Sequence, residues 1–285
     1  MPIRIVQSKQ NDRLKQLRRA LARPAHKPAR DASTLVALEG PNLVEEALRA
    51  GLAIDCLFLS ERFQPWLQSL ALPANTETLL VPKDLLASIL TTENPQLVAA
   101  LVHPFDWTWR DLLEGGVDGS NTAAPLLLIL AGLQDPGNLG AILRSAEAFG
   151  ASGVIALPGT VSAWNPKTIR ASAGSVLRVP FLAVPSDECF ARLREAHIPV
   201  LATVPQSSSK NQLHAMGPVA LLIGNEGNGV PADLAAKTDG VLTIPCPGPV
   251  ESLNAAVAAS ILLYEASRQR LAHSGGPLNR LGAHR

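Results

Sequence analysis

Short apolar runs alternate along the chain with stretches that carry apolar residues at helical spacing. Two of the runs, Leu126–Ala131 and Val219–Ile223, are continuously apolar, which is typical of strands buried on both faces of a parallel sheet. The pattern therefore predicts an α/β protein. The expected strands cover residues 34–38, 54–59, 79–81, 96–102, 126–131, 153–157, 179–182, 199–203, 219–223 and 241–244. The expected helices cover residues 11–21, 41–50, 83–90, 106–113, 138–149, 167–173, 187–196, 231–236 and 252–270.

The alternation weakens in one central stretch, which holds Gly115-Gly116 and then Asp118-Gly119-Ser120-Asn121. Such sequences are typical of a flexible joint between domains. We therefore expect a small α/β domain before the joint and a doubly wound, mostly parallel α/β domain after it. The predicted boundaries are 1–105 for the first domain, 106–124 for the linker, 125–272 for the second domain and 273–285 for a loose, Gly-rich tail.

Composition narrows the class of protein. The 285 residues are 47% hydrophobic and 17% charged, so the chain can bury a sizeable core. No apolar run approaches the roughly 20 residues that a bilayer-spanning helix needs, and no apolar stretch follows the basic N-terminus as in a secretory signal. The three cysteines, Cys56, Cys189 and Cys246, lack paired spacing, which argues against a disulfide framework or a zinc site. We expect a cytoplasmic protein without a membrane segment or a bound metal.

The formal net charge of +1 hides a strongly basic N-terminus. Residues 1–30 contain nine basic side chains and one acidic one, whereas the remainder has 16 basic and 23 acidic. Such asymmetry is typical of polyanion binding, because each cation near a phosphate releases counterions. A solvated helix face explains the same charge equally well. The nine basic residues are Arg4, Lys9, Arg13, Lys15, Arg18, Arg19, Arg23, Lys27 and Arg30.

Three loops rich in Gly, Pro and Asn follow predicted strands: Gln134–Gly140, Gly224–Gly229 and Pro245–Asn254. Ligands of open α/β sheets bind beyond the carboxyl ends of the strands, where glycine lets the backbone approach closely. None of the loops matches a phosphate loop, a GxGxxG dinucleotide fingerprint, a zinc-binding pattern or a nucleophile elbow. Taken singly, each is explained as a strand-to-helix turn, with Asn138 as a helix cap. Together they indicate a pocket for a neutral or zwitterionic ligand near the guanidinium of Arg144.

The order and spacing of these residues resemble the TrmH/SpoU branch of the SPOUT RNA methyltransferases. The resemblance covers residues 125–270, and residues 1–103 resemble the L30e-like substrate-binding domain of many members. The matching motifs are Asp135-Pro136-x-Asn138-x-Gly140-x-x-x-Arg144, Gly224-Asn225-Glu226-x-x-Gly229, Ile244-Pro245 with Ser252-Leu253-Asn254, and Arg170-Ala171-Ser172-Ala173-Gly174. In the N-terminal domain they are Glu39-Gly40-Pro41-Asn42 and Glu45-Glu46-Ala47-Leu48.

The resemblance implies a homodimer with a C-terminal trefoil knot that binds S-adenosylmethionine and methylates a ribose 2′-hydroxyl of RNA. The catalytic residues it implies are Asn138, Arg144, Glu226, Ser252 and Asn254. The cofactor-binding residues it implies are Thr203, Gly224, Asn225, Gly229, Ile244, Pro245, Ser252, Leu253 and Asn254. RNA binding is expected at Arg13, Lys15, Arg18, Arg19, Arg30 and Arg170, and deletion of residues 1–30 is expected to weaken it.

In this family the arginine at the position of Arg144 is often described as the general base. A guanidinium, however, stays protonated in proteins. We favour a fixed positive charge that stabilises the developing alkoxide or positions a phosphate. By family analogy the expected substrate is 23S-type ribosomal RNA. The alternatives are a transfer-RNA 2′-O-methyltransferase, a base-nitrogen methyltransferase and a catalytically silent knotted RNA-binding protein. A nicotinamide-dependent dehydrogenase is disfavoured because GxGxxG is absent.

Overall fold

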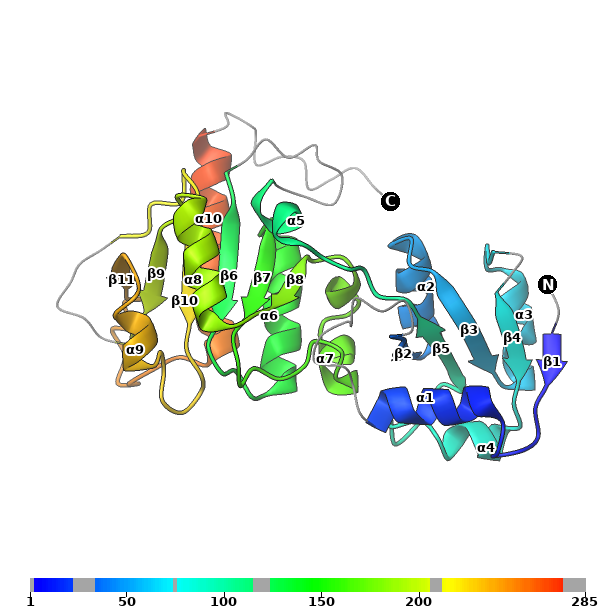
Figure 1. Cartoon of the computed structure of the whole chain (residues 1–285). Helices are drawn as coiled ribbons and strands as arrows, with labels where there is room; N and C mark the ends of the chain where they lie inside the picture. Colours follow the sequence, from blue (N-terminus) through cyan, green and yellow to red (C-terminus); the bar gives the residue numbers. More distant parts are fainter. Residues whose placement is uncertain (1–2, 23–33, 74–75, 115–123, 206–211, 274–285) are drawn as a thin grey trace. The chain divides into compact units, whose positions relative to one another are not determined.

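The computed structural model describes residues 3–22, 34–73, 76–114, 124–205 and 212–273. The chain divides into two compact units (Figure 1). The first contains Met1–Asp106 and Ser162–Arg178, and the second contains Trp107–Val161 and Val179–Arg285. Residues 162–178, which we expected in the second domain, therefore pack with the first.

The first unit is built on a five-stranded mixed sheet with the order β1-β4-β3-β5-β2. Strand β5 runs antiparallel to its neighbours β2 and β3, whereas β4 runs parallel to β1 and β3. The strands are β1 (Ile3–Ile5), β2 (Val36–Glu39), β3 (Ile54–Leu59), β4 (Glu77–Leu80) and β5 (Val98–Val102). The sequence pattern predicted the last four and missed the exposed edge strand β1.

Helix α1 (Asp12–Ala22) confirms the helix predicted over residues 11–21. Leu14, Leu17 and Leu21 are buried in the core under the sheet. The side chain of Asn11 accepts hydrogen bonds from the amides of Arg13 at 3.0 Å and Leu14 at 3.3 Å, and so caps the helix. The other helices of this unit are α2 (Pro41–Arg49), α3 (Gln64–Gln68), α4 (Lys83–Ala87) and α7 (Pro166–Ala171), with 3-10 turns η1 (Glu61–Phe63) and η2 (Ser175–Leu177).

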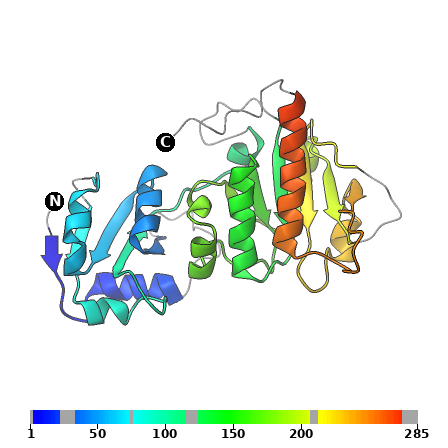
Figure 2. The ribbon, with the colours of Figure 1, turned by 180° about the vertical axis from the view of Figure 1, so that it is seen from behind.

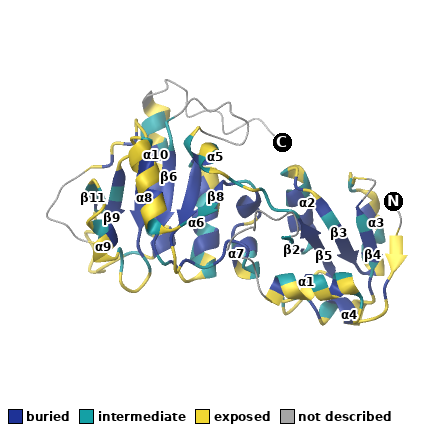
Figure 3. Ribbon diagram, viewed as in Figure 1, coloured by how far each residue is buried: buried dark blue, intermediate teal, exposed yellow. Residues whose placement is uncertain are grey.

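The second unit is built on a six-stranded, all-parallel sheet with the order β11-β9-β10-β6-β7-β8. The two central strands, β6 and β10, are buried at every position, which confirms the interpretation of their continuous apolar runs. Figure 3 shows the centre of this sheet in the colour of buried residues, whereas its two edge strands also carry residues of intermediate exposure. The strands are β6 (Leu126–Leu130), β7 (Gly153–Ala156), β8 (Phe181–Ala183), β9 (Val200–Thr203), β10 (Val219–Ile223) and β11 (Gly240–Leu242).

Helices cover both faces of this sheet, so the unit is doubly wound as predicted. Helices α6 (Pro136–Ala148) and α10 (Ala255–His273) lie side by side on one face (Figure 2), and α8 (Ser186–Glu195) covers the other (Figure 1). The Ser145 and Ser260 hydroxyls lie 2.7 Å apart across the α6–α10 contact. Helix α9 (Ala232–Ala235) precedes β11.

The predicted linker contains a helix that is part of the second unit. Helix α5 (Trp109–Leu113) places the side chain of Leu112 in the core of this unit. Its Trp109 indole nitrogen donates to the carboxylate of Glu188 on α8 at 3.0 Å. Residues 115–123 of the predicted linker and the predicted tail 274–285 lie outside the described residues.

The described part of the chain contains no helix long and apolar enough to cross a membrane. Within the same residues, no group of three or more His, Cys, Asp or Glu side chains is placed to hold a metal ion.

Candidate active site

The strand order explains why two of the three predicted loops meet. Strands β6 and β10 are neighbours and run parallel, so the loops that follow them leave the same edge of the sheet. From β6 the chain continues to β7 on one side, while β10 is flanked by β9 on the other. The order of strands therefore reverses between β6 and β10, and such a switch point is where doubly wound sheets bind their ligands.

A chain of side-chain hydrogen bonds links one residue from each of the three loops. The amide nitrogen of Asn254 donates to the amide oxygen of Asn138 at 3.0 Å. The amide nitrogen of Asn138 donates to the carboxylate of Glu226 at 2.9 Å. We call Glu226, Asn138 and Asn254 the relay. The structure thus brings together three of the five predicted catalytic residues.

Helix termini fix the orientation of the relay. The amide oxygen of Asn254 accepts from the backbone amides of Ala256 at 2.9 Å and Val257 at 3.3 Å, as an N-cap of α10. Only its amide nitrogen remains to face Asn138. On α6, the carboxylate of Asp135 caps the helix by accepting from the amide of Asn138 at 2.8 Å. Both asparagines are therefore anchored to the first turn of a helix that packs on the sheet.

Glu226 carries the negative charge at the end of the relay. Besides Asn138, it accepts from the backbone amides of Gln134 at 3.4 Å and Asp135 at 3.3 Å. Partial desolvation raises the pKa of Glu226, but the hydrogen bonds from Asn138 and the nearby backbone amides outweigh it and lower the pKa below its ordinary value. Glu226 is therefore an ionised acceptor at neutral pH that ties the second loop to the first.

The loop that carries Glu226 depends on a glycine at position 224. A Cβ on Gly224 would lie 2.0 Å from the carbonyl carbon of Gly229, which no backbone shift within this narrow loop accommodates cheaply. Asn225 and Gly229 exchange backbone hydrogen bonds of 3.1 and 3.2 Å. The side-chain oxygen of Asn225 accepts from the amides of Gly227 and Asn228 at 3.1 and 2.6 Å. The side chain of Asn225, which we expected at the cofactor, thus shapes the loop itself.

The third loop offers polar groups that the described residues leave unpaired. Thr243, two residues before this loop, has a buried hydroxyl without a hydrogen-bond partner in the described part of the chain. Within those residues, no backbone amide from 246 to 253 donates a hydrogen bond. Thr203, at the end of β9, donates to the Leu222 carbonyl at 2.9 Å. A buried orphan hydroxyl and free amides fit a ligand that is bound mainly through main-chain groups.

Arg144 and Ser252 do not join the relay within one chain. Both residues are exposed, and neither side chain makes a hydrogen bond or ion pair with any residue that the structure describes. Arg144 follows Asn138 by six residues on α6, which places it about 9 Å along the helix axis and about 120° around it. Its guanidinium is therefore available to a group from outside this chain.

The predicted RNA-binding residues have different surroundings in the first unit. Lys15, Arg18 and Arg19 lie exposed on α1. Arg13 is bound internally, with nitrogens 2.8 Å from Asp55 and 2.7 Å from Glu77. Desolvation lowers the pKa of Arg13, but Glu77 and Asp55 outweigh it and the pKa is raised. Arg170 lies 4.0 Å from the carboxylate of Glu39, and Arg30 lies outside the described residues.

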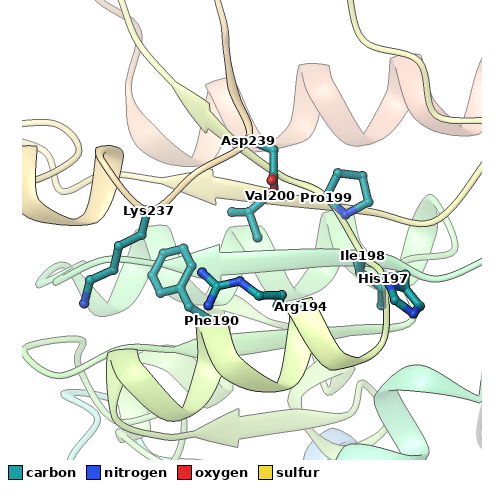
Figure 4. A pocket seen from close by; sticks show the side chains of 8 residues that line it. All are labelled: Phe190, Arg194, His197, Ile198, Pro199, Val200, Lys237 and Asp239. Carbon is teal, nitrogen blue, oxygen red and sulfur yellow. Dashed lines mark hydrogen bonds between the residues drawn. The ribbon is translucent and has the colours of Figure 1, made fainter.

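A cavity of about 330 Å³ lies away from the relay, beside the starts of β9 and β11. Figure 4 shows it between α8 and these strands, with Phe190, Arg194, His197, Lys237 and Asp239 in its wall. No residue of the three motif loops lines it. The functional assignment therefore rests on the relay and not on the shape of this cavity.

One residue that the sequence analysis did not single out supports the first loop. The hydroxyl of Thr160 accepts from the amide of Gly132 at 3.2 Å and donates to the carbonyl of Leu130 at 3.0 Å. The next amide, that of Val161, donates to the carbonyl of Leu133 at 2.8 Å. No local pattern marks Thr160, because its partners lie about thirty residues earlier in the chain.

The parallel doubly wound sheet with its convergent loops is shared with solved methyltransferases of the SPOUT fold. The chain belongs to the SpoU rRNA methylase family, whose model matches residues 125–264. The model of the MRM3-like substrate binding domain matches residues 11–100.

Curated relatives and solved structures agree with this assignment. The 23S rRNA (guanosine(2553)-2′-O)-methyltransferase RlmP of Bacillus subtilis is 34% identical over 244 residues, which cover 84% of this chain and 90% of that protein. The 23S rRNA (guanosine-2′-O-)-methyltransferase RlmB of Xanthomonas campestris is 40% identical over 162 residues, 56% of this chain and 64% of that one. The AdoMet-bound rRNA methyltransferase of Sinorhizobium meliloti has a TM-score of 0.78 at 30% identity and covers 94% of this chain and 98% of its own.

Proposed function

We propose that the protein transfers a methyl group from S-adenosylmethionine to a ribose 2′-hydroxyl of 23S-type ribosomal RNA. The observation that carries the proposal is the relay, which joins the three family motifs into one site at the switch point of the sheet. The names of RlmP and RlmB support both the 2′-oxygen as acceptor and ribosomal RNA as substrate. The first unit, which carries the MRM3-like match, supports binding of a structured RNA.

The loop 244–254, together with Thr203 and Gly224, would hold the cofactor. Its free amides and the orphan hydroxyl of Thr243 suit the amino-acid and ribose groups of S-adenosylmethionine. The exposed side chain of Val250 and the half-buried side chain of Leu253 supply apolar contact. When bound, the cofactor supplies an electrophilic methyl group, so the protein needs only to align the acceptor and ease loss of its proton.

The relay would align the acceptor, and Arg144 would ease the loss of its proton. Asn138 and Asn254 orient the ribose, and Glu226 holds the first two loops in register. Ser252, beside Asn254, faces solvent and would contact the RNA or the cofactor. Arg144 acts as a fixed positive charge near the developing alkoxide or a neighbouring phosphate, because a guanidinium keeps its proton.

The exposed apolar face of α10 supports a homodimer. Val257, Ile261, Tyr264 and Leu271 are 48%, 39%, 55% and 51% exposed, and their spacing places them along one face of the helix. A second copy that covers this face would lie next to α6, the helix that carries the unpaired Arg144. We therefore propose that the dimer completes the site. Sedimentation of wild type and Ile261→Glu tests this: a dimer that becomes a monomer supports it, and a wild-type monomer contradicts it.

The direct test of the proposed substrate is mass-spectrometric mapping of ribose methylation in RNA from cells with and without this chain. Loss of one 2′-O-methyl group from 23S-type ribosomal RNA supports the proposal. Loss of a methyl group from transfer RNA alone would assign the tRNA alternative. Unchanged methylation of both RNAs would favour a binding protein without catalysis.

A further inference from the structure

The segment Ser162–Arg178, which we call the clasp, belongs to two parts of the protein at once. It lies within the stretch that matches the SpoU methylase model, residues 125–264. It nevertheless packs within the first unit, together with Met1–Asp106. The chain leaves the second unit after Val161 and returns to it at Val179.

Two acidic residues of the first unit hold the clasp. The guanidinium of Arg178 is hydrogen bonded to the carboxylate of Glu46 on α2. The guanidinium of Arg170 on α7 lies 4.0 Å from the carboxylate of Glu39 and donates to the Thr91 hydroxyl at 3.3 Å. The Glu39 side chain is only 5% exposed and that of Arg170 is 34% exposed, so solvent screens this pair in part.

A glycine lets the clasp close on Glu46. Gly174 has a φ of +90°, and a Cβ there would lie 2.9 Å from the Cγ atom of Glu46. A larger residue at 174 would therefore be strained and would push the Glu46 side chain away from Arg178. The family motifs that contain Glu39, Glu46 and Gly174 thus meet around the clasp.

The clasp is continuous with the hydrogen bonds that support the first catalytic loop. Immediately before Ser162, the Val161 amide and the Thr160 hydroxyl bind the backbone of residues 130–133. The amides of Gln134 and Asp135 then bind Glu226 of the relay. Because the clasp follows these hydrogen-bonded residues directly in the chain, we expect a displacement of the clasp to reach the loop that carries Asn138.

We propose that Glu46 and Arg178 are positioning residues for methyl transfer: by fixing the clasp within the first unit, they let RNA held there set the catalytic loop through Thr160. This inference rests on the proposed function. Coupling between two sites passes through contiguous packed and hydrogen-bonded groups that respond to both sites. The clasp and Thr160 are such groups between the first unit and the loop that carries Asn138. Neither Glu46 nor Arg178 would touch RNA or cofactor in this role.

The test compares Arg178→Gln and Thr160→Val with Arg49→Gln, which removes the other partner of Glu46 and leaves the clasp intact. We expect a fall in the single-turnover rate of about threefold to tenfold for the first two variants. The dissociation constants for S-adenosylmethionine and RNA should change less than twofold. The double variant should lose no more than the worse single one, because both residues act in one path. The exchange Glu46→Arg with Arg178→Glu should restore part of the rate.

Amide hydrogen exchange of residues 132–138 gives a readout that does not need methyl transfer. We expect faster exchange there in Arg178→Gln and Thr160→Val than in Arg49→Gln, with unchanged melting temperatures. Equal exchange in all three, or rate losses that multiply in the double variant, would overturn the inference. If the wild-type protein transfers no methyl group, the proposed function is wrong. Amide hydrogen exchange of residues 132–138 then still tests whether the clasp is coupled to the first loop.

Discussion

The amide nitrogen of Asn254 lies 3.0 Å from the amide oxygen of Asn138, although 116 positions separate the two residues in the sequence. Each residue stands in the first turn of, or just before, a helix on the same face of the parallel sheet, so the backbone fixes both ends of this hydrogen bond. The contact joins the first and third motifs and completes the relay to Glu226.

Replacement of Asn138 should disable catalysis with little effect on folding. Asn138→Ala removes both relay hydrogen bonds, and misplacement of a reacting group by about 1 Å can cost on the order of 100-fold in rate. We expect a loss of that size in single-turnover methyl transfer. Asn254→Ala should cost a similar factor, and the double variant little more.

Asn11→Ala is the matched control for Asn254→Ala, because it removes a side chain that caps α1 far along the sequence from the motifs. Its stability should fall by about 1 kcal/mol, as for other lost caps, while its transfer rate stays near that of wild type. Full activity of Asn138→Ala would show that the relay has no catalytic role.

The charge of Glu226 should make the stability of the site depend on pH. The folded state lowers the pKa of Glu226, so its ionised form stabilises the protein above its ordinary pKa, and this contribution is lost as pH falls through the folded value. Denaturant unfolding of wild type and Glu226→Gln, from about pH 7 to about pH 3, should therefore give free energies that converge on acidification. A difference that stays constant with pH would contradict the assignment.

Arg144→Lys keeps the positive charge and loses the planar fork of the guanidinium. We expect a clear fall in methyl transfer and unchanged binding of S-adenosylmethionine by calorimetry, since Arg144 contacts no described residue of the loop 244–254 that we propose binds the cofactor. Near-full transfer by the lysine variant would show that charge alone suffices. Arg192→Lys, an exposed position on α8, serves as the control.

The exposed face of α1 should bind RNA through its charge. The triple variant Lys15→Gln, Arg18→Gln, Arg19→Gln should reduce the slope of log K against log salt by about 2, at roughly 0.7 per phosphate contact of single-stranded RNA. Deletion of residues 1–30 is unsuitable for this test, because it removes the buried Leu14, Leu17 and Leu21 as well. Neutralising Arg192, Arg194 and Lys237 in the second unit is the control, and an equal effect there would argue for non-specific attraction.

The three cysteines should differ in reactivity. Burial, together with the nearby charge of Glu188, raises the pKa of Cys189 to about 12, and burial also raises that of Cys56, whereas Cys246 is exposed in the loop 244–254 that we propose binds the cofactor. A thiol reagent should therefore modify Cys246 first under native conditions. S-adenosylmethionine should slow this modification. Rapid labelling that the cofactor does not alter would place the binding site elsewhere.

Much of the fold follows from local pattern. The strand Val219–Ile223 has the predicted bounds, because its five apolar residues are buried on both faces. Helix α1 follows from the spacing of Leu14, Leu17 and Leu21. The loops were expected to converge because loops that follow parallel strands leave the same edge of the sheet, which is where such sheets bind their ligands.

The sequence pattern does not predict contacts between residues that lie far apart in the chain. Arg178 meets Glu46 across 132 positions, and no periodicity marks either residue. The charge of Arg13 is visible in the sequence, and its RNA binding stays a prediction, but the sequence does not reveal that it pairs with Asp55 on β3 and Glu77 on β4. The edge strand Ile3–Ile5 was missed because it is short and exposed at each position.

Transfer of an isotope-labelled methyl group from S-adenosylmethionine to a 23S-type ribosomal RNA, followed by mass spectrometry of the nucleosides, tests the central claim most directly. We predict label on a ribose 2′-oxygen with wild type and a loss on the order of 100-fold with Asn138→Ala. Label on a base, or equal transfer by both proteins, would contradict the claim that the relay aligns a ribose for methylation.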